Sequence, residues 1–109
     1  MPVDNETFAL NYTQVAREDM LDILMYISDE LQSPQAAERI LEKIEKDLER
    51  LREHPYSAPI ARDTYLSSQG FRMLVAGKYL VFYKINESFS EVLIYRIVYG
   101  KRNIEWLMP

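Results

Sequence analysis

The sequence predicts an α+β fold in which a hairpin of two helices packs on a mainly antiparallel four-stranded sheet. Three observations support this. Apolar residues recur at helical spacing in two neighbouring stretches before residue 55, apolar runs of strand length follow over residues 71–99, and proline or glycine separates the segments. The expected order is β-α-α-β-β-β. At 109 residues the chain, 1–109, is expected to be a single domain.

The first strand and the first helix follow each other directly. Residues 8–12 alternate larger apolar side chains with smaller or polar ones, which is typical of a strand, and Thr13 is a plausible helix cap. The helix should end near Gln32. Its acidic residues, among them Asp19 and Asp22, are expected on a solvated face. The apolar stripe consists of Ala16, Met20, Ile23, Leu24, Ile27 and Leu31.

A second helix begins at Ser33-Pro34, because serine caps a helix and proline fits its first position. Only about two residues link it to the first helix, so the two should form an antiparallel hairpin. His54-Pro55 ends the helix, and we expect residues 55–69 to form a loop ordered by Tyr56, Ile60, Tyr65 and Leu66. The second apolar stripe consists of Ala37, Ile40, Leu41, Ile44, Leu48 and Leu51.

Three strands complete the predicted sheet. Residues 71–75 form the first, Gly77-Lys78 supplies the turn, and the almost continuously apolar segment 79–85 should be a central strand. Residues 91–99 form the last strand, and residues 104–107 suggest a short helix or an apolar tail. In the last strand we expect Val92, Ile94, Arg96 and Val98 on one face, and Leu93, Tyr95, Ile97 and Tyr99 on the other.

Composition limits the possible chemistry. The chain has no cysteine and one histidine, His54, so disulfides and a multi-histidine metal site are excluded and no cofactor is expected. No apolar run is long enough for a membrane span and the N-terminus does not resemble a signal peptide, so we expect a cytoplasmic protein.

The net charge of −4 is unevenly distributed. Residues 1–54 carry thirteen acidic and six basic side chains, whereas residues 55–109 carry four acidic and seven basic ones. The acidic half is poorly suited to nucleic acid, and the basic half suits an acidic protein or a phosphate backbone.

Six short patterns occur in a fixed order between about residues 8 and 107. They are Ala16-x-x-Asp19-x-x-x-Ile23-x-x-Tyr26-Ile27, Pro34-x-Ala36-Ala37-Glu38-Arg39, Leu51-x-x-x-Pro55, Phe71-Arg72-Met73-Leu74-Val75, Tyr79-Leu80-Val81-Phe82-Tyr83-Lys84-Ile85 and Val92-x-Ile94-x-Arg96-Ile97-x-Tyr99-Gly100-x-Arg102. In these patterns the sequence resembles the RelE/ParE family of toxins from bacterial type II toxin–antitoxin systems, which include plasmid-stabilising systems. The resemblance implies a growth-inhibiting toxin, an antitoxin that wraps it, and operator DNA contacted only through the antitoxin.

The resemblance allows two activities. RelE-like members cut mRNA on the ribosome with clustered basic residues and no metal, whereas ParE-like members poison DNA gyrase. Of the RelE-type positions, Arg72 and Arg102 match, but two expected basic residues fall at Leu74 and Leu80 and an expected tyrosine falls at Met108. We therefore favour gyrase poisoning. An mRNA endonuclease and a degenerate toxin that only binds its antitoxin stay open, and so does whether the chain is an enzyme.

Each activity has its own candidate residues. An endonuclease would use Arg72, Arg102, Lys101 and Tyr99, with the cations stabilising charge at phosphorus and the tyrosine moving a proton. For antitoxin binding the candidates are Arg96, Lys101, Arg102 and Trp106. A structural ion pair with a carboxylate of the first helix is the alternative for Arg96. Sheet packing is the alternative for the strand tyrosines, Tyr99 included.

Overall fold

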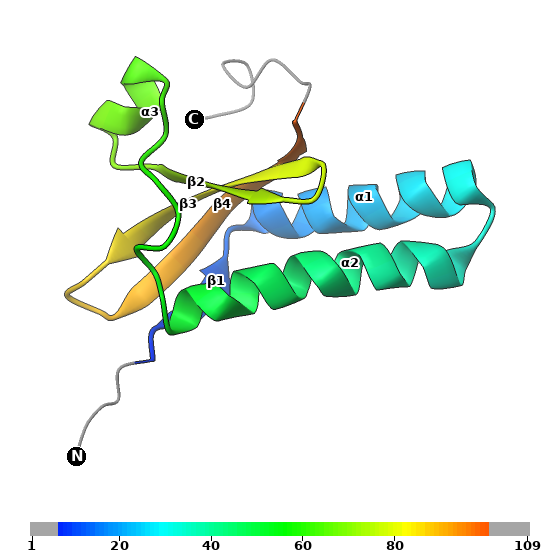
Figure 1. The fold of residues 1–109 in the computed structure, drawn as a ribbon, viewed down its shortest axis with the longest axis horizontal. Coiled ribbons are helices and arrows are strands. Elements are labelled where there is room, and N and C mark those ends of the chain that lie inside the picture. The colour runs from blue at the N-terminus through cyan, green and yellow to red at the C-terminus, as the bar shows by residue number, and fades with distance from the viewer. Residues whose placement is uncertain (1–6, 101–109) are drawn as a thin grey trace.

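The computed structural model describes residues 7–100 as a helical hairpin packed on one face of a four-stranded sheet (Figure 1). The sheet order is β1-β4-β3-β2, with β1 parallel to β4 and the other neighbours antiparallel, which confirms the predicted fold class and element order. In the described range no helix is long and apolar enough to cross a membrane. The elements are β1 (Ala9–Tyr12), α1 (Gln14–Leu31), α2 (Pro34–Glu49), the 3-10 turn η1 (Arg50–Arg52), α3 (Thr64–Ser68), β2 (Arg72–Ala76), β3 (Tyr79–Asn86) and β4 (Glu91–Tyr99).

The helix ends follow the capping residues that the sequence indicates. The Thr13 hydroxyl accepts the Ala16 N–H at 3.0 Å, and the Ser33 hydroxyl accepts the Ala36 N–H at 3.2 Å. Each bond satisfies a backbone donor that has no partner within the helix. Gln32 adopts a left-handed conformation with φ 52° and reverses the chain between the helices. The predicted starts of both helices and the end of the first are therefore confirmed. The second helix ends earlier than predicted, because α2 stops at Glu49 and the chain continues as η1 only to Arg52, before His54-Pro55.

Apolar side chains pack on both faces of the sheet. The larger core lies between the sheet and the hairpin and contains buried residues from every strand except β1, whose apolar side chains pack against it. A smaller cluster on the opposite face contains Phe82 and Val98 and is closed by Leu66 of α3 and by Phe71. The chain itself therefore covers part of the sheet face that lies opposite the hairpin.

The segment predicted as a loop over residues 55–69 contains the short helix α3. Asp63 caps it by accepting the Leu66 N–H at 3.0 Å, and Leu66 is buried in the smaller cluster. Tyr56, Ile60 and Tyr65, also expected to order this segment, expose about half of their surface. A helix of five residues is too short to show an apolar period in the sequence.

The predicted alternation of β4 is wrong beyond Tyr95, because the strand contains a β-bulge. Phe82 pairs with Arg96 and Tyr83 with Ile94, which leaves Tyr95 without a partner in β3. The extra residue shifts the two-residue period, so Ile97 shares the hairpin-side core with Ile94, whereas Val98 lies in the opposite cluster.

The hairpin projects past one end of the sheet that it covers. At 18 residues α1 measures about 27 Å. Figure 1 shows the last turns of α1 and the first turns of α2 projecting beyond the strands. This overhang leaves part of both apolar stripes without a sheet against it.

Thr13 joins the helix to the bulge, because its hydroxyl also donates to the Tyr95 carbonyl at 3.0 Å. We predict that Thr13→Val, which removes both bonds but keeps the shape, lowers the free energy of unfolding by about 2 kcal/mol. The matched variant Ser33→Ala, which loses only a cap, should cost about 1 kcal/mol. Urea denaturation measures both, and equal losses would contradict the bridging role of Thr13.

Candidate functional site

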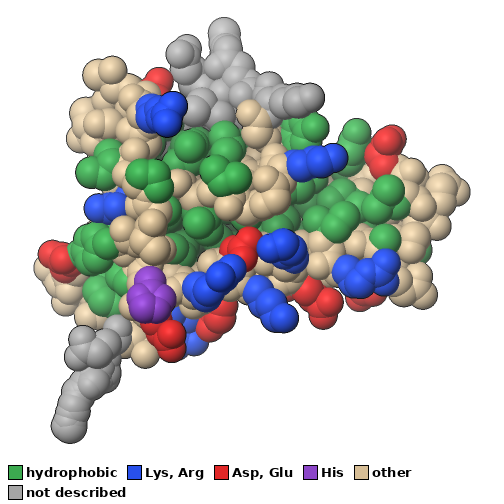
Figure 2. Space-filling model, in the orientation of Figure 1, with side chains coloured by type: hydrophobic (Ala, Val, Ile, Leu, Met, Phe, Trp, Pro, Cys, Tyr) green, Lys and Arg blue, Asp and Glu red, His purple; other side chains and the backbone are tan. Residues whose placement is uncertain are grey.

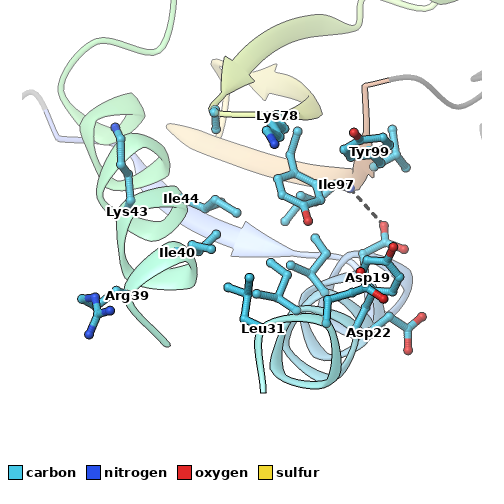
Figure 3. Close-up of a pocket in the computed structure, with 18 of the residues that line it drawn as sticks. Asp19, Asp22, Leu31, Arg39, Ile40, Lys43, Ile44, Lys78, Ile97 and Tyr99 are labelled. Atoms are coloured by element: carbon cyan, nitrogen blue, oxygen red, sulfur yellow. Dashed lines mark hydrogen bonds between the residues drawn. The ribbon is translucent and has the colours of Figure 1, made fainter. Parts of the chain in front are cut away.

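An apolar groove of about 1100 Å³ lies between the overhanging hairpin and the end of the sheet. Both helices, the β2–β3 turn and the last residues of β4 line it. In Figure 3, Ile40 and Ile44 point from α2 across the groove toward Ile97 of β4. Its apolar lining includes Ile23, Ile27, Leu31, Ile40, Ile44, Ala76 and Ile97.

The groove is open because the helical stripes continue past the strands. Leu31 ends the stripe of α1 and is 50% exposed, and Tyr26, five residues earlier and nearer the sheet, is 64% exposed. Apolar surface of this kind, rimmed by charged residues, is typical of an interaction site. The space-filling view shows apolar side chains gathered between the hairpin and the sheet, with lysine and arginine side chains along α2 (Figure 2).

A partly buried ion pair forms the inner end of the groove. The Asp19 carboxylate accepts hydrogen bonds from Arg96 Nε at 2.8 Å and Nη2 at 3.0 Å. It also accepts the backbone N–H of Ile97 at 2.9 Å, drawn as the dashed line in Figure 3. The expected ion pair between Arg96 and a carboxylate of the first helix is confirmed. The prediction that Asp19 is solvated is wrong, because the residue is 9% exposed.

Asp19 lies at this position because β1 is shorter than β4. The last residue of β1, Tyr12, pairs with Ile94, so residues 95–99 of β4 have no neighbouring strand on that side. Asp19 of α1 supplies the acceptor that a longer β1 would have provided to the Ile97 N–H. Its spacing from Ala16 and Ile23 places it on the buried face of the helix.

Three tyrosines gather where the groove opens beside β4. The rings of Tyr79 and Tyr99 meet edge to face with centroids 5.9 Å apart. Burial raises the pKa of Tyr79, and the neighbouring phenols of Tyr99 and Tyr26 raise it further. The Tyr79 hydroxyl therefore stays protonated at neutral pH and can donate a hydrogen bond. Of these three tyrosines, only Tyr99 was predicted from the sequence as a site residue.

The two helical walls of the groove carry different charges. Asp22 and Glu30 lie on the α1 wall, whereas Arg39 and Lys43 lie on the α2 wall and Lys78 lies on the β2–β3 turn. Figure 3 shows Arg39 and Lys43 on the opposite side from Asp22. A bound segment would therefore meet acidic groups on one side and basic groups on the other.

The residues predicted for an endonuclease are not brought together within the described part of the chain. Arg72 donates to the Ala58 carbonyl at 2.6 Å, and its guanidinium lies over the Tyr56 ring. Tyr99 pairs with Tyr79 of β3, and Tyr79 pairs with Ala76 of β2. Ala76 lies four residues from Arg72, which is about 13 Å along the strand at the usual rise per residue. The remaining candidates, Lys101, Arg102 and Trp106, lie outside the described residues.

The comparisons with known proteins agree with this fold. The family model described as the ParE toxin of the type II toxin–antitoxin system parDE matches residues 10–104. The chain belongs to the ParE toxin family. No curated protein is significantly similar to it.

Two solved structures share the fold of this ParE-family chain. One, a chromosomal ParDE toxin–antitoxin system from P. aeruginosa, is 17% identical with a TM-score of 0.72 and covers 89% of this chain and 100% of its own. The other, the toxin–antitoxin complex RelBE2 from Mycobacterium tuberculosis, is 21% identical with a TM-score of 0.58 and covers 85% and 98%.

Proposed function

We propose that this ParE-family toxin arrests growth by poisoning DNA gyrase in the cytoplasm, and that a cognate antitoxin neutralises it by occupying the groove. The observation that carries the choice of target is the position of Arg72. Its guanidinium is held by the Ala58 carbonyl and the Tyr56 ring, at the opposite end of β2 from the strand end where Tyr99 lies. Such a separation favours inhibition by protein contact over phosphodiester chemistry, which needs both groups at one phosphorus.

The groove supports an antitoxin partner by its size and lining. Apolar side chains of two helices and a strand end converge on it, and such a concavity suits an apolar segment of a partner. The two solved structures of similar fold are titled as toxin–antitoxin systems. The antitoxin is also the partner through which the chain would reach operator DNA.

A gyrase assay on antitoxin-free protein tests the target. We expect inhibition of supercoiling together with trapped double-strand cleavage. Tyr99→Phe, which keeps the ring and removes the proton-transfer group, should retain growth arrest. An endonuclease that depended on the Tyr99 hydroxyl would lose about 10²-fold or more of its activity in this variant. Growth arrest without any effect on gyrase would shift the assignment to mRNA cleavage, and no arrest would indicate a degenerate toxin.

A charge placed in the groove tests the antitoxin site. We predict that Leu31→Glu weakens binding of the protein encoded beside this chain's gene by about tenfold or more, because a carboxylate would be buried against apolar surface. Phe89→Glu is the matched control, since Phe89 is 78% exposed in the β3–β4 turn outside the groove. Isothermal titration calorimetry measures the affinity of both variants, and equal affinities would show that the antitoxin does not bind in this groove.

A further inference from the structure

The tyrosine corner, defined here as Tyr26, Tyr79 and Tyr99, presents aromatic surface from three elements to one place on the groove rim. Tyr79 and Tyr99 meet edge to face, and Tyr26 of α1 lines the same groove. Tyr26 is 64% exposed and Tyr99 is 38% exposed, so both rings keep free surface. The exposed parts of these rings are therefore free to contact a bound segment.

A carboxylate without a partner lies on the same wall. Among the described residues, the Asp22 side chain makes no hydrogen bond or ion pair, although Asp19 on the preceding turn is fully engaged by Arg96 and Ile97. Asp19 and Arg96 offset each other, so the charge left on the α1 wall is negative, from Asp22 and Glu30. The cations that line the groove from α2 and the turn, Arg39, Lys43 and Lys78, lie on its other sides.

We propose that the tyrosine corner and Asp22 together bind the guanidinium of an arginine side chain carried by the segment that fills the groove. This deepens the proposed function and rests on it for the identity of the partner. A planar guanidinium stacks on aromatic rings and donates paired hydrogen bonds to a carboxylate, which an ammonium group does less well. Phenolic oxygens accept its remaining N–H groups.

The charges of the groove then fix how the partner lies. An arginine of the partner meets the tyrosine corner on the α1 side, and its acidic residues face the cations of α2. Reversing the segment or rotating it would place like charges together, which disfavours the wrong register. An otherwise acidic antitoxin therefore needs one arginine at the position that reaches the corner.

N-acetyl-arginine amide is the probe, because it tests the pocket without any antitoxin. We expect it to shift the ring signals of all three tyrosines and the Asp22 amide saturably in NMR titrations of the full chain. The neutral isostere N-acetyl-citrulline amide should bind about tenfold more weakly, and N-acetyl-lysine amide several-fold more weakly. Equal shifts from all three probes would overturn the proposal.

Two variants locate the binding. Asp22→Asn should weaken binding of the arginine probe about fivefold, whereas Asp29→Asn, the same change two turns along the exposed surface of α1, should leave it unchanged. Tyr26→Leu should abolish the tyrosine shifts, and the wild-type-like amide spectrum expected for an exposed residue would show that the fold is intact.

Equal losses in Asp22→Asn and Asp29→Asn would show unspecific charge attraction and contradict the pocket. Arginine binding with no effect on gyrase would leave the pocket standing and reject the proposed target alone.

Discussion

One carboxylate determines how the helical hairpin sits on the sheet. β4 has nine residues and β1 only four, so the outer edge of β4 beyond Ile94 lacks a neighbouring strand. Asp19 of α1 accepts hydrogen bonds there from the Ile97 N–H and from the Arg96 guanidinium. Removing one member of such a pair leaves an uncompensated charge and typically costs about 3–5 kcal/mol. Thr13, bonded to Tyr95 at the bulge, anchors the start of α1, six residues earlier.

The groove follows from this attachment. With its N-terminal half fixed to β4, α1 continues past the end of the short strands, and α2 returns alongside it over the same distance. The apolar stripes of the two helices then have the sheet against them for only part of their length. A longer sheet would bury Leu31 and Tyr26, but it would also fill the space in which we place the antitoxin. The hairpin overhang thus links an incompletely covered core to the surface at which we propose that the antitoxin binds.

Local sequence signals were sufficient to predict the helices and strands, but not to predict which residues of β4 face the hairpin. Thr13, Ser33-Pro34 and Gly77 fix helix ends and a turn through the backbone chemistry of single residues, so their positions could be predicted. The bulge at Tyr95 could not, because it arises from pairing between strands and from Thr13 lying opposite it. The same holds for the site. An ion pair for Arg96 was expected, but the sequence did not indicate which carboxylate would form it, because α1 contains several acidic residues. Only the packing of α1 beside the edge of β4 distinguishes Asp19 from the others. Its spacing from Ala16 and Ile23, which places it on the buried face, was a usable signal.

Hydrogen exchange at the Ile97 amide tests the central claim most directly. If Asp19 holds the bare edge of β4, this amide should exchange in the wild-type chain almost as slowly as the amides bonded between β3 and β4. In Asp19→Ala its protection should fall by more than that of the β3–β4 amides, and the free energy of unfolding should drop by about 3 kcal/mol. The exposed control Asp22→Ala should change neither by much. Fast exchange at Ile97 in the wild type, or unchanged protection in Asp19→Ala, would contradict the account.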